Sequence, residues 1–224
     1  MADPALSISA QLPADWRARL RNGLLSAPDH RRESSRLGGL ASRSATLRAR
    51  VQDAWPVSVR AAAVLVAIVD HPDNPTLLLT LRASHLRQHA GQISFPGGQL
   101  ESADANVAAG AIRETHEEIG IDVSFIEPIG FLADHMVQSG FRITPVVALV
   151  RPGFILKPDS TEVADVFELP LSLALAIESY RAQQRMVREI EVDVWELTFG
   201  EYQIWGATAG ILVNLCEVVS GANA

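Results

Sequence analysis

The sequence predicts an α+β protein in which a mixed β-sheet lies between helices, an α/β/α sandwich. Two apolar runs, residues 57–70 and 76–82, predict buried strands separated by a turn. Residues 104–120 predict a helix of about four turns that ends at Gly120. Predicted strands and helices do not alternate strictly along the chain, which argues against a doubly wound parallel sheet.

Length and composition exclude several classes of protein. With 224 residues, of which 48% are hydrophobic and 20% charged, the chain is neither disordered throughout nor fibrous. The longest uninterrupted apolar run, residues 61–69, is too short to cross a bilayer. A single cysteine, Cys216, cannot form an internal disulfide, so we expect a reducing, cytoplasmic location. Within its apolar helical run, Cys216 is expected to fill core space.

Charge divides the chain into two parts. Residues 1–50 hold nine arginines and four acidic residues, whereas residues 51–224 hold ten basic and twenty-two acidic residues. The acidic part lacks the basic stripe that a nucleic-acid-binding surface needs. We therefore predict a basic helical arm over residues 1–55, one domain over residues 56–224 and no nucleic-acid partner.

The arm contains one predicted helix, over residues 13–25, where Trp16, Leu20 and Leu24 recur at helical spacing. A Ser- and Arg-rich stretch with weak periodicity follows it. This composition also fits a transit peptide, but early acidic residues and the lack of an apolar signal core argue against that reading. We favour an arm that packs on its own domain or on the partner subunit of a homodimer.

Further elements are expected after the central helix. Strands are predicted at residues 129–136, 143–150 and 163–170. A hairpin over residues 183–199 is expected to turn near residues 189–193, and residues 205–219 predict a C-terminal helix. The sequence shows no internal repeat and no low-complexity tract.

Three carboxylates in the central helix indicate a metal site. Glu114, Glu117 and Glu118 share one helix face within a turn, near the C-terminus where the macrodipole disfavours anions. Solvated surface glutamates are the alternative interpretation, but a glycine pair before the helix, Arg113 and Gly120 accompany them. Hard oxygen ligands of this kind favour Mg²⁺ or Mn²⁺ bound to phosphate oxygens.

Residues 97–121 resemble the Nudix box, the loop–helix–loop signature of hydrolases that cleave a nucleoside diphosphate linked to another group. Its usual pattern is G-x5-E-x7-R-E-U-x-E-E-x-G-U, where U is aliphatic, and seven positions match: Gly98, Arg113, Glu114, Glu117, Glu118, Gly120 and Ile121. Thr115 replaces the aliphatic residue after Glu114. The early acid is Asp104, and eight residues separate it from Arg113.

Both departures are similar to the coenzyme A pyrophosphatase branch of this family. That branch carries a second signature, L-L-T-x-R-x3-L-R-x-H-x-G-x3-F-P-G-G, and residues 78–98 match it at every specified position. The resemblance covers residues 57–219 and implies a Nudix fold with a mixed sheet. It also implies a metal-dependent hydrolase that converts coenzyme A or its derivatives to 3′,5′-ADP and 4′-phosphopantetheine or its acyl form.

The resemblance implies roles for the box residues. The glutamates Glu114, Glu117 and Glu118 would hold Mg²⁺ or Mn²⁺, with the Gly97 carbonyl as a further ligand. Arg113 is expected to point away from the metal and pair with an acid of the preceding loop, Asp104 or Glu101. Asp104 stands where the helix should begin, so an N-cap role is expected as well.

Residues outside the box helix complete the predicted site. Glu162, before the strand at 163–170, is the candidate for a distal acid. Arg82, Arg87 and His89 are the groups available to bind the phosphates of coenzyme A, although a purely structural role for this motif is the alternative. His116, between the box glutamates, is interpreted as an exposed face residue rather than a base.

Two other functions remain open. A Nudix hydrolase could instead act on ADP-ribose, a dinucleotide or a nucleoside triphosphate. A catalytically silent nucleotide-binding module is the alternative from a different class, but such proteins typically lose box glutamates, and here all three are present.

Overall fold

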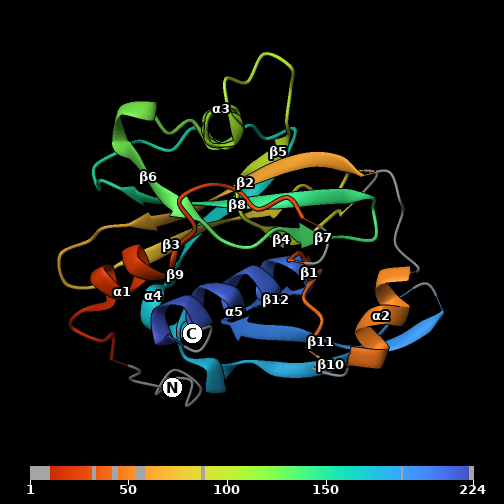
Figure 1. Cartoon of the computed structure of the whole chain (residues 1–224). Coiled ribbons are helices and arrows are strands. Elements are labelled where there is room, and N and C mark those ends of the chain that lie inside the picture. The colour runs from red at the N-terminus through yellow and green to blue at the C-terminus, as the bar shows by residue number, and fades with distance from the viewer. Residues whose placement is uncertain are drawn as a thin grey trace.

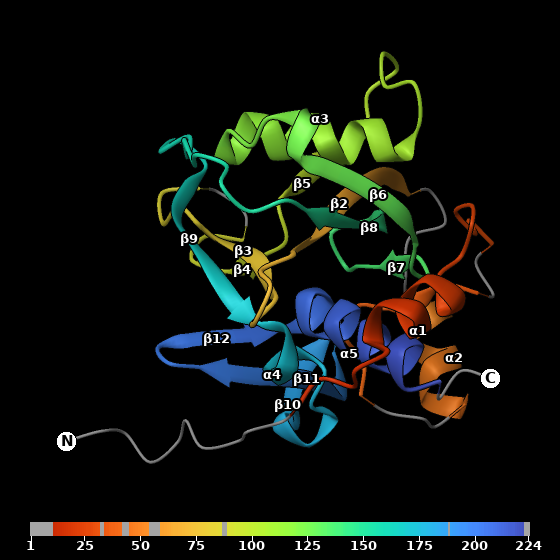
Figure 2. The same ribbon diagram turned by 90° about the vertical axis from the view of Figure 1, so that its left-hand side faces the viewer.

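The computed structural model describes residues 11–31, 34–41, 45–53, 59–86, 89–187 and 189–221. A large mixed sheet forms the centre (Figure 1), with one helix on one face and several on the other. A small sheet lies beneath the second helical layer (Figure 2). The predicted α+β class with an α/β/α layering is confirmed, and the small sheet adds a further layer.

Strand β2 (Arg60–Val69) is the middle of the large sheet, which joins nine strands of the described chain. It runs parallel to β8 (Phe141–Val150) and antiparallel to β3 (Thr76–Arg82) and β5 (Gly97–Gln99). The remaining strands of this sheet are β1 (Arg36–Leu37), β4 (Ile93–Ser94), β6 (Ile126–Phe131), β7 (His135–Met136) and β9 (Val163–Pro170).

Helix α3 (Val107–Ile119) covers one face of this sheet. Helices α1 (Trp16–Gly23) and α5 (Gly206–Ser220) lie on the other face and contact each other. Short helical segments complete the chain: α2 (Ala45–Asp53), α4 (Leu171–Ala174) and the 3₁₀ turns Val123–Phe125 and Ile177–Ser179. Among the described residues, no helix combines the length and the apolar character that a membrane span requires.

The small sheet is antiparallel and consists of β10 (Arg181–Val187), β11 (Ile190–Phe199) and β12 (Tyr202–Trp205). Its first two strands are the predicted hairpin, with the turn slightly before the expected place. Strand β12 was not predicted, because four residues carry too little alternation to distinguish a strand from a loop.

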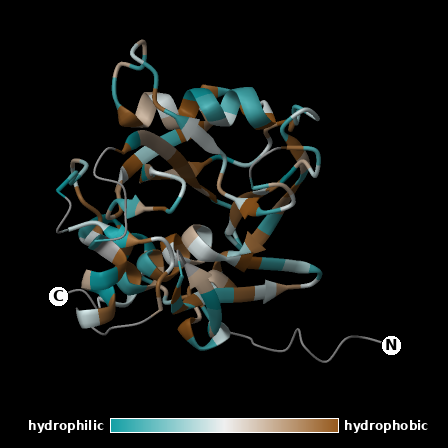
Figure 3. Ribbon diagram, turned by 90° about the vertical axis from the view of Figure 1, so that its right-hand side faces the viewer, coloured by the Kyte–Doolittle hydropathy of each residue, from teal (hydrophilic) through white to brown (hydrophobic). Residues whose placement is uncertain are grey.

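Apolar residues fill the two sides of the large sheet separately. One cluster joins the sheet to α1 and α5, and includes Trp16, Leu20 and Leu212. The other joins the sheet to α3 and includes Ala111 and Ile119. In Figure 3 the hydrophobic colour follows the sheet strands, in agreement with these clusters. Buried on both faces, β2 has a continuous apolar run instead of an alternating one.

The described N-terminal residues are built into both sheets. Strand β1 pairs with β7 in parallel, and Leu40 forms a bridge with Val194 of β11. The N–H of Trp195 donates to the Gly39 carbonyl at 2.9 Å. The segment 36–41 therefore ties the edge of the large sheet to the small sheet.

Several arginines of the N-terminal region pair with acids of the acidic part. Arg17 pairs with Asp70, and Arg21 lies 3.1 Å from Glu127. Arg36 lies 2.5 Å from Glu217 of α5, with both side chains about one quarter exposed. The basic charge of this region thus faces the excess of acidic charge on the rest of the chain. The boundary near residue 55 stays a prediction.

Gly39 has a backbone requirement that can be tested. Its φ is +81°, and a Cβ there would lie 1.9 Å from the Gly206 carbonyl oxygen at the start of α5. Gly200 also has a positive φ, +57°, but a Cβ there would meet no atom within 4 Å. We expect Gly39→Ala to reduce the free energy of unfolding by more than about 2 kcal/mol, and Gly200→Ala by about 1 kcal/mol. Urea unfolding of both variants measures this, and equal losses would contradict it.

Candidate active site

Two glycines bring strand β5 against helix α3. Gly97 has a φ of +147°, and a Cβ there would lie 2.3 Å from the Ala63 carbonyl oxygen of β2. A Cβ on Gly98 would lie 2.4 Å from Oε2 of Glu114. Neither position can take a side chain without moving backbone or carboxylate. The glycine pair therefore sets how closely the helix carboxylates approach the sheet.

The ends of helix α3 are fixed by its own sequence. Asn106 is the N-cap, and its side chain accepts from the Ala109 N–H at 2.9 Å. Gly120 ends the helix with a φ of +76°, as predicted. The expectation that Asp104 caps the helix is wrong, because its carboxylate is occupied elsewhere.

Asp104 binds Arg113 with both oxygens. The Nε and Nη2 atoms of Arg113 donate to this carboxylate at 2.9 and 3.0 Å, while Glu101 lies at 4.0 Å. The expected pairing of Arg113 with the preceding loop is confirmed for Asp104. This hydrogen bonding lowers the pKa of Asp104 and raises that of Arg113.

Arg113 also contacts two box carboxylates. Its Nη1 donates to Glu114 at 2.9 Å and to Glu117 at 3.0 Å. The expectation that Arg113 points away from the metal face is therefore wrong. One guanidinium neutralises the loop acid on one side and the catalytic face of the helix on the other, which its planar fork of donors allows.

Glu118 is the buried carboxylate of the site, with only 4% of the residue exposed. Its Oε2 accepts from the Gly97 N–H at 3.0 Å, and its Oε1 lies 3.7 Å from Nη1 of Arg82. Burial raises the pKa of Glu118 to about 7, although Gly97 and Arg82 oppose the shift.

The other acids surround Glu118 with negative charge. Burial raises the pKa of Glu114, and Arg113 opposes this effect. The negative charge of Glu162 contributes to the raised pKa of both Glu114 and Glu118. The backbone of Glu162 is fixed because its carbonyl accepts from the Ala83 N–H at 2.8 Å.

The donor set fits a hard divalent cation. Arg113 contacts Glu114 and Glu117, Arg82 lies near Glu118, and Glu162 adds negative charge to the surroundings of Glu114 and Glu118. The missing Cβ of Gly98 leaves the space that the Glu114 carboxylate occupies. In the described part of the chain, no three acidic, histidine or cysteine side chains converge as a ready metal-binding group. Glu114 and Glu117 each have one oxygen on Arg113.

A cavity of about 660 Å³ lies beside the glycine strand. Gly97, Gly98 and Arg82 line it, and these residues in turn lie next to Glu114 and Glu118. His89 lines the same cavity, with Nδ1 at 2.7 Å from Gln92 Oε1. Arg87 lies outside the described residues. The second signature and the box thus meet at one cavity, while the binding roles of these residues stay predictions.

Sequence reasoning missed a second set of cavity residues. These come from the N-terminal region and from the small sheet, and they include Leu37, Leu40, Val51, Arg185, Met186, Val192, Val194 and Trp205. No motif marks them. Trp205 stays 36% exposed, an unusual exposure for a tryptophan that only the structure reveals.

The sequence profile of the NUDIX domain matches residues 59–190, which is more than half of the chain. The chain belongs to the Nudix hydrolase family. The curated relatives of this Nudix hydrolase include an "Uncharacterized Nudix hydrolase NudL" of Enterobacter sp. (strain 638). It is 44% identical over 156 residues, which are 70% of this chain and 81% of the relative. The protein of the same name from Shigella flexneri serotype 5b (strain 8401) is 42% identical over 160 residues, 71% and 83% of the two chains.

Solved structures similar to this Nudix hydrolase are more distant. A MutT/nudix family protein from Enterococcus faecalis has a TM-score of 0.47 and 16% identity, with 81% of this chain and 70% of that chain covered. A C. elegans Ap4A hydrolase binary complex has a TM-score of 0.44 and 20% identity, with 53% and 86% covered. The enzyme class and the box residues therefore rest on the family match. Nudix hydrolases generally use divalent metal ions such as Mg²⁺ or Mn²⁺.

The buried carboxylate of Glu118 predicts a pH-dependent stability in metal-free protein. The folded state keeps the Glu118 proton up to about pH 7, whereas the unfolded state releases it near 4.5. Unfolding therefore releases a proton between these values, and a rising pH favours the unfolded state. We expect the free energy of unfolding in chelator to fall by on the order of 2 kcal/mol between pH 5 and 8 through this group.

Urea unfolding of the wild type and of Glu118→Gln measures this effect. The variant should show a smaller fall with pH and should be the more stable of the two at pH 8. Glu191→Gln, an exposed position on β11, is the matched control and should follow the wild type. Parallel pH profiles for the wild type and Glu118→Gln would show that the carboxyl titrates normally.

Proposed function

We propose that this Nudix hydrolase cleaves the diphosphate bond of coenzyme A or its derivatives, giving 3′,5′-ADP and 4′-phosphopantetheine or its acyl form. One observation carries the proposal. The two signatures of the coenzyme A branch occur together in the sequence, and Arg82 and His89 of the upstream signature line the same cavity as Gly97 and Gly98, which both signatures share. At the cavity wall, Arg82 can offset the buried carboxylate of Glu118 and can also bind an anionic substrate group.

The chain's own residues support a hydrolytic step. Arg82 is one quarter exposed, lines the cavity and lies beside the box, so its guanidinium can bind a phosphate oxygen of the substrate. Its Nε is buried with no hydrogen-bond partner in the described structure, which leaves a donor free for an anion. Glu118, with a pKa near 7, can hold or release a proton at neutral pH.

Glu114, Glu117, Glu118 and the Gly97 carbonyl would hold Mg²⁺ or Mn²⁺. Such an ion, when bound, neutralises the diphosphate and acidifies a water molecule. Arg113 anchors the catalytic face of the helix to the loop at Asp104 while Glu114 and Glu117 are free to exchange it for a metal. Glu162, just before β9, contributes negative charge near Glu118, and either Glu162 or a box glutamate is the candidate general base.

Hydrolysis of another nucleoside diphosphate derivative, such as ADP-ribose, a dinucleotide or a nucleoside triphosphate, is the alternative activity. Box and metal ligands serve all these substrates equally, so the choice rests on the residues 78–98. A silent binding module is disfavoured because the three box glutamates are present and face one another. A cytoplasmic location and a homodimer stay predictions.

A substrate panel tests the proposed activity. With Mg²⁺ or Mn²⁺ in heavy-oxygen water, we expect coenzyme A to be cleaved faster than ADP-ribose, a dinucleotide or a nucleoside triphosphate. Mass analysis should find 3′,5′-ADP and 4′-phosphopantetheine and should show which phosphate gained the label. Turnover of ADP-ribose with coenzyme A untouched would overturn the proposal.

The box glutamates give a second prediction. Glu114→Gln and Glu117→Gln should each lower kcat by about a hundredfold or more, because each removes a charged ligand from the site. Circular dichroism and thermal unfolding should show an intact fold, and Glu191→Gln should keep normal turnover. Near-normal turnover in both box variants would place the metal site elsewhere.

A further inference from the structure

The loop before β9, residues 157–162, closes the C-terminal end of helix α3. The N–H of Lys157 donates to the Ile119 carbonyl at 2.9 Å, and the N–H of Asp159 donates to the Glu118 carbonyl at 2.9 Å. These carbonyls belong to the last turn of the helix, where they have no partner within the helix itself. Strand β9 therefore starts beside this helix end, as Figure 2 shows. Glu118 thus contributes its carboxylate to the site and its backbone to the attachment of the loop.

The Asp159 side chain holds the loop in a tight turn. Its Oδ1 accepts from the Thr161 N–H at 2.8 Å and from the Thr161 hydroxyl at 2.7 Å. The Asp159 carbonyl accepts from the N–H groups of Glu162 and Val163 at 3.0 and 2.8 Å. The hydrogen bonds from the Thr161 N–H and hydroxyl lower the pKa of Asp159, so the side chain is a carboxylate at neutral pH. One residue, bonded to the end of α3, therefore fixes the backbone as far as Glu162.

Residues 83–85, within the upstream signature, hold the same loop from another side. The N–H of Ala83 donates to the Glu162 carbonyl at 2.8 Å, and Nε2 of His85 lies 3.0 Å from the Thr161 carbonyl. Because a carbonyl oxygen only accepts, Nε2 of His85 carries the proton in this contact. The backbone of Glu162 is thus held both by the segment that follows Arg82 and by the turn on the end of α3.

We infer that Asp159 is a positioning residue for the reaction, which sets the place of Glu162 relative to Glu118 through its turn with Thr161. The inference rests on the proposed function, in which Glu162 is a candidate general base. Glu162 contributes negative charge to the surroundings of Glu114 and Glu118. It is exposed, so core packing does not hold its side chain, and its place depends on the backbone that carries it. A displacement of about 1 Å at a reacting group is enough to slow a reaction strongly.

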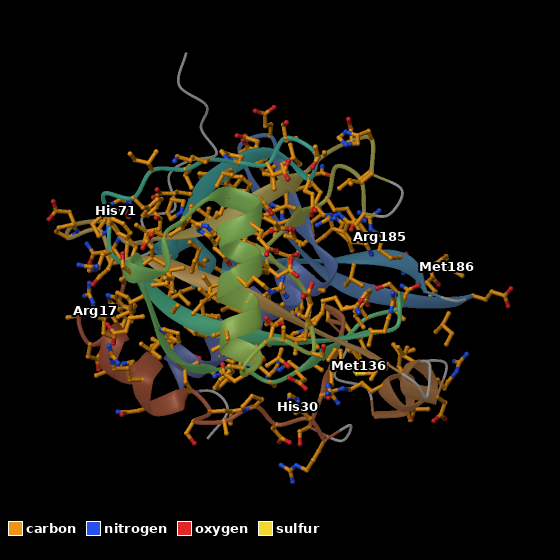
Figure 4. The ribbon with its side chains drawn as sticks, turned by 90° about the horizontal axis from the view of Figure 1, so that it is seen from above. Arg17, His30, His71, Met136, Arg185 and Met186 are labelled. Carbon is orange, nitrogen blue, oxygen red and sulfur yellow. The ribbon has the colours of Figure 1, made fainter. Side chains whose placement is uncertain are left out.

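The turn lies apart from the part of the cavity that the small sheet forms. Figure 4 looks onto α3 from above and shows the cavity residues Arg185 and Met186 to one side of this helix. Among the described residues, the cavity lining includes neither Asp159 nor Glu162. A change at Asp159 is therefore expected to lower kcat and to leave KM within about twofold of the wild-type value.

Kinetics of the full chain with coenzyme A and Mg²⁺ test the assignment. Asp159→Ala should lower kcat by about tenfold, because the turn loses its acceptor. Asp159→Asn keeps an oxygen for the Thr161 N–H and should stay within about twofold of the wild type. Asp122→Ala is the matched control and should keep normal kcat, since Asp122 accepts from the Ser124 N–H at 2.9 Å in a similar exposed turn just after α3. Asp159 is exposed as well, and unfolding temperatures check that each variant folds.

A double-variant cycle separates positioning from a general effect on structure. If Asp159 acts through Glu162, Asp159→Ala should lower kcat by less than about twofold in a chain that already carries Glu162→Gln. An equal fall in both backgrounds, or normal turnover of either single variant, would overturn the inference. The wild-type rate with coenzyme A tests the proposed function separately. If the wild type cleaves ADP-ribose and leaves coenzyme A untouched, the proposed substrate fails, and the same cycle with ADP-ribose still decides the role of Asp159.

Discussion

The close approach of helix α3 to strand β5 is the constraint on which the site depends. Gly97 and Gly98 carry no side chain, so the carboxylates of Glu118 and Glu114 lie directly against the strand. Glu118 can be buried only because the Gly97 N–H replaces part of its hydration. The same two glycines also line the cavity. Glycine at these positions is therefore as much a part of the site as the acids.

Arg113 balances part of the negative charge of the site by its contacts with three carboxylates. A cluster of carboxylates without a cation would repel itself, and one guanidinium that reaches Asp104, Glu114 and Glu117 removes most of that cost. Glu118 lies beyond its reach and has the raised pKa that follows from burial. Glu114 and Glu117 can therefore exchange Arg113 for a metal ion. Glu118 can gain or lose a proton near neutral pH.

Short-range sequence patterns correctly predicted those strands and helix ends that are determined by neighbouring residues in the chain. Continuous apolar runs identified β2 and β3 because both strands are largely buried, and Gly120 identified the end of α3. Asp104 and Asn106 are both residue types that favour a helix N-cap. Asn106 takes this position, because the Asp104 carboxylate pairs with Arg113. The missed elements β1 and α2 have distant contacts, such as the pairing of β1 with β7 and the apolar cluster of Val51 with Val192, which no sequence spacing reveals. The cavity residues of the N-terminal region and the small sheet were missed for the same reason.

Ion pairs with the rest of the chain account for part of the excess of basic charge in the N-terminal region. Arg17, Arg21 and Arg36 pair with acids on three different parts of the chain, Asp70, Glu127 and Glu217. The more exposed pairs, those of Arg17 and Arg21, contribute little stability each, so they orient the segment more than they stabilise it. What they orient includes Leu37 and Leu40 at the cavity wall. The net charge of −7 is thus no obstacle to an anionic substrate, because the arginines of this region offset surface acids while the box carboxylates are left to a metal ion.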